Sequence, residues 1–285
     1  MRVQRYSVFL NHQNISNFFF YFFDIYFTPT KQNLAYLIDF LYFCIILKKS
    51  NIMFQSCKAI VLHTTHHTDK TTLIHLYSRE LGRICAAVSG LHGKKSNTRS
   101  SLFTPLALLQ VTIQNKNGHI RIQEAAIASP NTSIATHHGK RTIAFFIAEF
   151  LTHCLQEQDA DEDMFDYLCQ TIQLLEEQAF QPDFHLHLMM QLTHHLGFFP
   201  NINGNGDFFD LVDGIRRTLH PNHPNFLTPA AATPFFTLCQ SYGAKLNLTR
   251  AERQELLDNL LHYYQLHIPY FGKLKSVSIL QELFD

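Results

Sequence analysis

LALLQVTIQNKNGHIRIQEAAI (residues 106–127) sets the fold class, because two apolar runs flank the dipeptide Asn117-Gly118. An Asn-Gly pair between such runs is the usual signal of a two-residue β-hairpin. We therefore expect strands over residues 106–114 and 120–127. Upstream, three further short runs at residues 57–63, 72–78 and 84–88 are separated by turns. Five short strands in about 75 residues predict a small closed barrel.

Downstream of Pro130 the apolar residues change to helical spacing. Helices are expected over residues 139–157, 164–177, 182–196 and 249–267, with a last short helix from Ser276. Gly197 is placed to end the third helix, and Thr249 with Glu252 forms a capping box before the fourth. Residues 198–227 are rich in Gly, Asn and Pro and are expected to be mostly loop. The predicted class is α+β multidomain, with a five-stranded barrel at residues 53–130 and an all-helical C-terminal domain at residues 131–285.

The two halves of the chain carry opposite charge. Residues 57–130 hold nine Lys/Arg and three Asp/Glu, whereas residues 131–285 hold nine Lys/Arg and 18 Asp/Glu. The formal net charge of zero for the whole chain hides this difference. A basic barrel joined to an acidic helical half indicates a protein that binds a polyanion with one end and another partner with the other.

Basic residues of the barrel are the candidate contacts to phosphates. They are Lys58, Arg79, Arg83, Lys94, Lys95, Arg99, Lys116 and Arg121. Single-strand binders add aromatic platforms on which bases stack, and Tyr77 and Phe103 are the candidates for that role. The alternative is that residues 90–101 form an ordinary solvated basic loop.

Residues 1–52 differ in composition from the rest, with no Gly and many Phe, Tyr, Ile and Asn. Their apolar run at residues 34–47 is shorter than the roughly 20 residues of a membrane span. Lys48-Lys49 follows it, where a signal peptide needs small residues. We interpret residues 1–52 as a non-native or disordered extension translated from AT-rich upstream sequence, with the functional start at Met53. A membrane anchor and an ordered extension are the alternatives.

The chain carries no convincing catalytic motif. Its six cysteines form no CxxC pair, which fits a reducing cytoplasm. Gly93-Lys94-Lys95-Ser96 fails as a phosphate loop because Val88 stands where the first Gly is needed. Several of the 18 histidines come in close pairs, but none has the spacing of a metal site. We expect no enzyme activity, no metal and no cofactor. A His-rich metal-dependent hydrolase is the alternative.

In both halves the chain resembles the RecO family of bacterial DNA repair proteins, in the form seen in Bacteroidetes. At the barrel end the likeness rests on KAIVLH (58–63), YSRELGR (77–83), GKKS (93–96) and LFTPL (102–106). In the helical half it rests on AEFL (148–151), FDYL (165–168), LGFFP (196–200), YYQLH (263–267) and KSVSILQELFD (275–285). Many members carry a four-cysteine zinc site after the Leu-Gly-Phe motif, but residues 201–227 contain no Cys. Residues 1–52 match nothing in the family.

The resemblance implies an N-terminal OB-fold barrel and a recombination mediator in the cytoplasm. Such a protein binds single- and double-stranded DNA and anneals complementary strands. With RecR, it helps load RecA onto DNA coated by single-strand-binding protein. No stable membrane association is expected, although a membrane-tethered scaffold using residues 1–52 is a further alternative.

The acidic tail of single-strand-binding protein needs a cation beside apolar surface. Lys140 and Arg141 open the first long helix, next to Phe145 and Phe146. These four residues are therefore the candidate partner site, since a half with excess Asp and Glu is a poor surface for DNA. The alternative is a solvated helix start.

Overall fold

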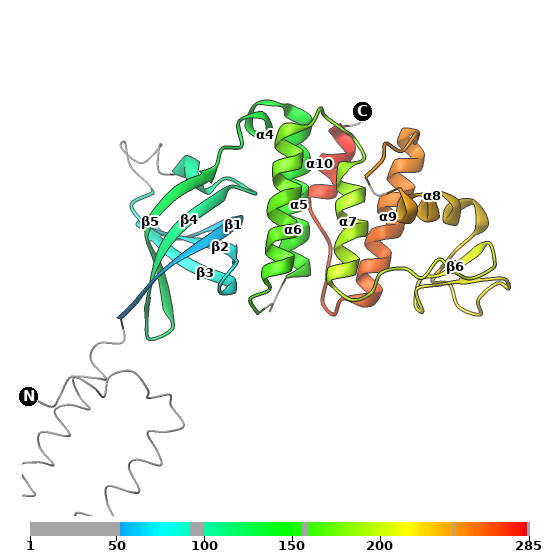
Figure 1. Ribbon diagram of the computed structural model, residues 1–285, viewed down its shortest axis with the longest axis horizontal. Coiled ribbons are helices and arrows are strands. Elements are labelled where there is room, and N and C mark those ends of the chain that lie inside the picture. Colours follow the sequence, from blue (N-terminus) through cyan, green and yellow to red (C-terminus); the bar gives the residue numbers. More distant parts are fainter. Residues whose placement is uncertain (1–51, 92–99, 156–158, 242, 284–285) are drawn as a thin grey trace, which may run out of the picture. The chain divides into compact units, whose positions relative to one another are not determined.

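The computed structural model describes residues 52–91, 100–155, 159–241 and 243–283 (Figure 1). The chain divides into two units, Met1–Ile52 and Met53–Asp285. The expectations for residues 1–51, including a membrane tether, lie outside the described residues, as do Lys94, Lys95 and Arg99. Among the helices that the structure describes, none combines the length and apolar character that crossing a membrane requires.

Five strands form the N-terminal barrel, as predicted. They are β1 (Ile52–Thr68), β2 (Thr71–Ser78), β3 (Gly82–Ser89), β4 (Leu108–Lys116) and β5 (His119–Ser129). Their order is β1-β2-β3-β5-β4, and the sheet closes on itself. Next to the short helix η1 (Ser101–Phe103), the Val61 N–H donates to the Ala107 carbonyl at 3.0 Å, and the Leu106 N–H donates to the Val61 carbonyl at 2.8 Å.

The hairpin at Asn117-Gly118 is confirmed. Both residues have positive φ, 54° and 82°, as a type I′ turn requires. The β1 strand is longer than predicted, at 17 residues, because only residues 57–62 are largely buried and its mostly exposed ends carry no apolar pattern. The turn between β2 and β3 covers residues 79–81, since Gly82 already pairs with Ser78.

Helices dominate the C-terminal half, and four long ones lie near their predicted ranges. The described helices are α4 (Thr132–Thr136), α5 (His138–Cys154), α6 (Glu162–Glu177), α7 (Phe184–His195), α8 (Pro229–Gln240), α9 (Arg250–His267) and α10 (Ser276–Leu283). The capping box of Thr249 and Glu252 is present at the start of α9. Gly197, with φ of 81°, follows α7 as expected. Helix α8 was not predicted, because Pro234 lies inside it and interrupts the helical pattern.

A small sheet corrects the prediction that residues 198–227 are mostly loop and that this half is all helical. Strands β6 (Phe208–Asp210), β7 (Ile215–Arg217) and β8 (Phe226–Leu227) pair antiparallel in the order β7-β6-β8. The buried Asp210 carboxylate accepts hydrogen bonds from the Val212 and Asp213 N–H groups at 3.0 and 3.1 Å. It also lies 3.2 Å from the His223 ring. These bonds hold the β6–β7 turn without any cysteine.

Alternate residues of the barrel strands face two different cores. Val61 packs inside the barrel, whereas Ile60 and Leu62 belong to the core of the helical half. Tyr77 joins the same helical core, with its ring 6.2 Å from that of Phe165 on α6. The barrel is therefore attached to α5 and α6 by buried apolar contact (Figure 1).

Candidate nucleic-acid interface

Exposed cations of the barrel gather near one end of β3. Arg121 of β5 is exposed and pairs with Ala87 of β3. Two residues further along β3, Ser89 pairs with Thr71, which follows the exposed Lys70. The Lys70 carbonyl accepts from the Gly90 N–H at 3.2 Å, so this turn lies at the start of the basic loop. Lys70 was missed in the sequence, although its place in a polar turn was a usable signal.

Two further predicted contacts, Lys116 and Lys58, are exposed but lie in different places. Lys116 ends β4 and pairs with His119 across the hairpin, two residues from Arg121. Lys58 lies instead on the side of the barrel that faces α6. Its N–H donates to the Glu80 carboxylate at 3.1 Å, and its positive charge helps to lower the pKa of Asp166. Lys116 therefore lies near Arg121 on the hairpin side, and Lys58 lies apart from both.

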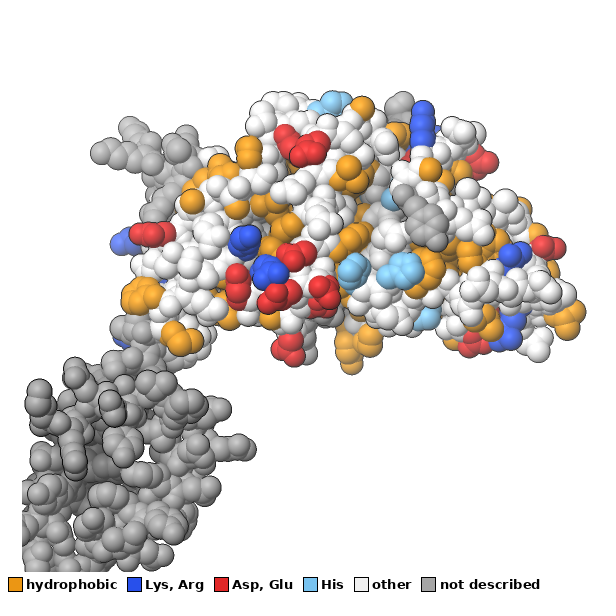
Figure 2. All heavy atoms as spheres, in the orientation of Figure 1, with side chains coloured by type: hydrophobic (Ala, Val, Ile, Leu, Met, Phe, Trp, Pro, Cys, Tyr) orange, Lys and Arg blue, Asp and Glu red, His pale blue; other side chains and the backbone are white. Residues whose placement is uncertain are grey.

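Arg79 is engaged by two carboxylates of α6. Its guanidinium donates to both oxygens of Asp166 at 3.0 and 3.1 Å and lies 2.8 Å from Glu162. The hydrogen bond from Arg79 lowers the pKa of Asp166 below its ordinary value. Figure 2 shows Lys/Arg and Asp/Glu side chains together where the barrel meets α6. Arg79 thus joins the two halves of the protein, which leaves less of its charge for a phosphate.

Arg83 has a similar structural role at the end of α5. Its guanidinium donates to the carbonyls of Thr152 at 2.9 Å and Leu155 at 3.1 Å. The last carbonyls of a helix lack partners within the helix and carry partial negative charge, so a cation satisfies them well. Arg83 is also half-buried, which leaves little of its charge for a phosphate.

The two predicted stacking platforms are buried. Tyr77 is 0% exposed, and Phe103 of η1 is 6% exposed and packs in the barrel core. Burial raises the pKa of Tyr77 to about 12. Neither ring offers a face to a base, so neither can serve as a stacking platform.

The predicted partner site separates into a buried and an exposed pair. Lys140 is 3% exposed, and its Nζ donates to the Ser133 hydroxyl and to the Glu176 carbonyl, each at 2.8 Å. Phe146 is 0% exposed and lies in the core. Arg141 and Phe145, four residues apart on α5, are exposed. Only the second pair is placed to meet a partner.

Arg141 and Phe145 line a groove between the barrel and the helices. Its volume is about 780 Å³. One wall comes from the barrel, with Leu62, His63, Thr64, Phe103 and Pro105, and the other from α5 and the start of α10. Lys275 and the half-exposed Ile279 line the same groove. It therefore combines two cations and the Glu149 carboxylate with exposed apolar side chains.

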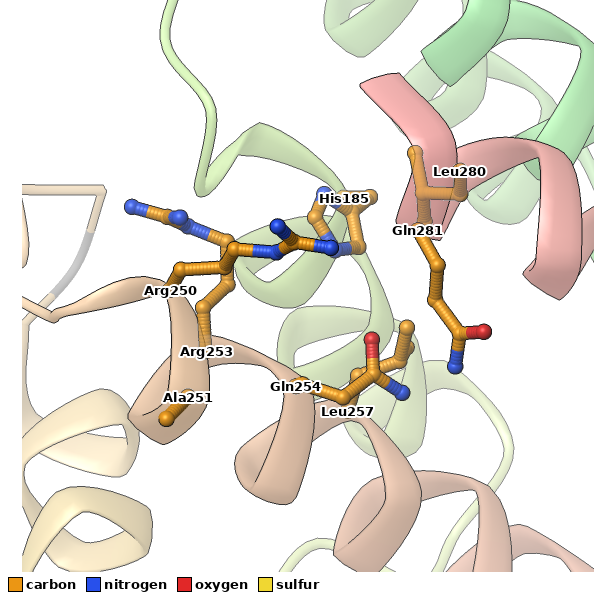
Figure 3. A pocket seen from close by; sticks show the side chains of 8 residues that line it. All are labelled: His185, Arg250, Ala251, Arg253, Gln254, Leu257, Leu280 and Gln281. Carbon is orange, nitrogen blue, oxygen red and sulfur yellow. The ribbon is translucent and has the colours of Figure 1, made fainter. Parts of the chain in front are cut away.

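A second pocket lies between α9 and α10, with His185 of α7 also lining it (Figure 3). Arg250, Arg253 and Gln254 of α9 and Gln281 of α10 contribute its polar side chains. Arg253 is already paired with the buried Asp183 at 2.6 Å and donates to the Leu248 carbonyl. Much of the positive charge in this pocket is thus used within the fold.

Several of the described histidines take part in packing and hydrogen bonding. His63 stacks on His75 with ring centroids 3.9 Å apart, and His194 stacks on Phe199 at 3.5 Å. Burial lowers the pKa of His63 to about 4, with help from the charges of His75, Arg83 and His153. Within the described part of the chain, no three His, Cys, Asp or Glu side chains are grouped so that they could hold a metal ion.

Two family models match the chain, covering both halves. Residues 53–131 match the model described as Recombination protein O N terminal, and residues 139–206 match Recombination protein O C terminal.

Curated relatives extend the match over most of the chain. DNA repair protein RecO of Bacteroides fragilis is 33% identical over 242 residues, which covers 82% of this chain and 100% of the relative. RecO of Azobacteroides pseudotrichonymphae is 31% identical with the same coverage. RecO of Porphyromonas gingivalis is 34% identical over 241 residues, covering 80% of this chain and 98% of the relative.

Proposed function

This chain belongs to the RecO family, and on that premise we propose that it acts in DNA repair and recombination by binding DNA through its barrel. The observation that carries the proposal is the position of the exposed Lys70, Lys116 and Arg121 on the closed barrel. Lys70 and Arg121 lie near the end of β3 from which the predicted basic loop departs, and Lys116 lies two residues from Arg121 towards the β4–β5 hairpin. These three cations would neutralise phosphates, and Lys94, Lys95 and Arg99, outside the described residues, are proposed as further contacts from the sequence.

The proposed role is that of a mediator without covalent chemistry. It would bind single and double strands, anneal complementary strands and, with RecR, help load RecA onto DNA coated by single-strand-binding protein. The family resemblance supports these finer steps. Phosphate contacts fit this role, because they bind strands of any sequence and are released as salt rises.

The groove beside Arg141 supports a proposal for the protein partner. The acidic tail of single-strand-binding protein would place its carboxylates near Arg141 and its apolar end against Phe145 and Ile279. This assignment keeps Arg141 and Phe145 from the predicted partner site. It leaves out Lys140 and Phe146, because both are buried.

DNA binding by the full chain at several salt concentrations tests the central proposal. Three to six phosphate contacts on a single strand predict a slope of roughly −2 to −4 in log K against log salt. Replacing Lys70, Lys116 and Arg121 by Ala should flatten this slope by about 2. Replacing Lys245 by Ala, an exposed lysine outside the barrel, is the control. An unchanged slope in the triple variant would place the DNA site elsewhere.

A further inference from the structure

The connection between α9 and α10 presents an exposed aromatic ring followed by two exposed lysines. Residues 268–275 read IPYFGKLK and contain no Asp or Glu, although the helical half as a whole is acidic. Tyr270 is 93% exposed, and Lys273 and Lys275 are exposed. We propose that this loop is a second contact for single-stranded DNA, with Tyr270 stacking on a base and the two lysines meeting phosphates. The inference rests on the proposed DNA binding and extends it beyond the barrel.

The loop is held firmly on both sides of the lysine pair. Phe271, next to Tyr270, is 2% exposed and packs against the rings of Phe150 and Tyr264. Its carbonyl is hydrogen-bonded to the His153 ring. A binding loop that is already ordered loses less conformational entropy when its ligand binds.

At the other end, the Glu149 carboxylate accepts from the N–H groups of Lys275 at 3.0 Å and Ser276 at 2.8 Å. Partial burial alone would raise the pKa of Glu149, but these hydrogen bonds and that of the Ser276 hydroxyl lower it overall. The Glu149 carboxylate thus holds the backbone where α10 begins. The side chains of Lys273 and Lys275 therefore extend into solvent from an ordered backbone.

Tyr270 adopts a backbone conformation that favours glycine. Its φ is 58°, in the left-handed region that residues with a Cβ adopt at a cost. The ring lies on the surface of the turn after α9 rather than in the core, at 93% exposure. An observed backbone outlier of this kind is a reason to ask for a function.

The chemistry of the loop favours single strands over the other polyanions. A base of a single strand has a free π-face for a tyrosine, whereas the bases of a duplex are stacked on one another. An acidic peptide with an aromatic end needs a concave apolar site, but the Tyr270 ring projects into solvent. The loop is also bound to His153, next to Thr152, which contacts His63 of the barrel at 3.2 Å.

Anisotropy with a labelled oligo-dT of about 30 nucleotides and a duplex of equal length tests the site on the full chain. Tyr270→Ala should weaken oligo-dT binding by about 5- to 150-fold, the range of one stacked base, and change duplex binding much less. Tyr270→Phe keeps the ring and should bind oligo-dT like the wild type. Lys273→Ala with Lys275→Ala should flatten the salt slope for oligo-dT by about 1.4. Lys245→Ala is the matched control.

The possible results separate this site from the proposed function. Wild-type protein that binds neither probe would overturn DNA binding altogether, and this site with it. If the wild type binds oligo-dT and Tyr270→Ala binds it equally well, the loop site alone is wrong. Equal losses for Tyr270→Phe and Tyr270→Ala would also overturn stacking. A variant that still binds oligo-dT but no longer binds an acidic peptide would assign the loop to a protein partner instead.

Discussion

Arg79, on the turn after β2, donates two hydrogen bonds to the Asp166 carboxylate of α6, at 3.0 and 3.1 Å. These residues lie 87 positions apart in the chain, and the pair connects the basic barrel to the acidic helical half. Part of the charge difference between the halves is thus used to hold them together. Lys70, Lys116 and Arg121 are exposed and remain open to a ligand.

We expect Arg79→Ala to affect stability rather than DNA binding. The Arg79 side chain is 30% exposed, so water and salt screen its ion pairs and the melting temperature should fall only slightly. DNA affinity should stay within about 2-fold, since no phosphate contact is lost. Arg121→Ala is the matched comparison and should do the reverse, keeping the melting temperature and flattening the salt slope by about 0.7. A steep loss of DNA affinity in Arg79→Ala would return this residue to the DNA site.

Lys140→Ala should lower the free energy of unfolding by about 2–4 kcal/mol. The substitution removes two hydrogen bonds of a buried ammonium, so the Ser133 hydroxyl and the Glu176 carbonyl each lose this hydrogen-bond donor. Arg141→Ala, one residue away but exposed, should stay within about 0.5 kcal/mol of the wild type. Urea unfolding of both variants measures the difference. Equal stability of the two would show that Lys140 is not structural.

The contrast between Lys140 and Arg141 shows what the sequence reveals and what it does not. Helical spacing alone puts Phe146 on the buried stripe with Ile143, Ile147 and Phe150. The same spacing puts Lys140 three residues before Ile143, so its burial could have been predicted. The role of Arg79 could not, because Glu162 and Asp166 are distant in the chain and only the folded structure brings them near.

The small sheet and the groove could not be predicted from the sequence for a related reason. Strands β6, β7 and β8 have two or three residues each, which is too short for an alternating pattern to show. The groove needs β1, α5 and α10 together, and it forms only when Leu62 and Tyr77 enter the helical core. The barrel itself was predictable, because each of its strands pairs with a neighbour through a local turn signal or a strong apolar run.

The groove predicts a division of labour between DNA and protein partners. The double variant Arg141→Glu with Phe145→Ala should weaken binding of an acidic peptide with an aromatic end by at least about 10-fold. The reason is that it reverses a charge and removes apolar contact. Binding of naked DNA should hardly change. Anisotropy with the labelled tail peptide of single-strand-binding protein measures the first effect, and Leu174→Ala, another exposed apolar residue on a helix, is the control. If peptide binding survives while DNA binding drops, the groove belongs to DNA.

Acid should destabilise the protein through His63. Burial, and then the charges of His75, Arg83 and His153, lower the pKa of His63 to about 4, whereas an unfolded chain binds this proton near pH 6.5. Between these values the unfolded state holds more protons, so stability falls as the pH drops from about 6.5 to 4. The expected loss from this residue is about 1–2 kcal/mol, less than the full shift implies because the ring is partly solvated. His63→Gln should remove that part of the slope in urea unfolding at several pH values. His119→Gln, exposed on the β4–β5 hairpin, should keep it, and a His63→Gln profile parallel to the wild type would refute the assignment.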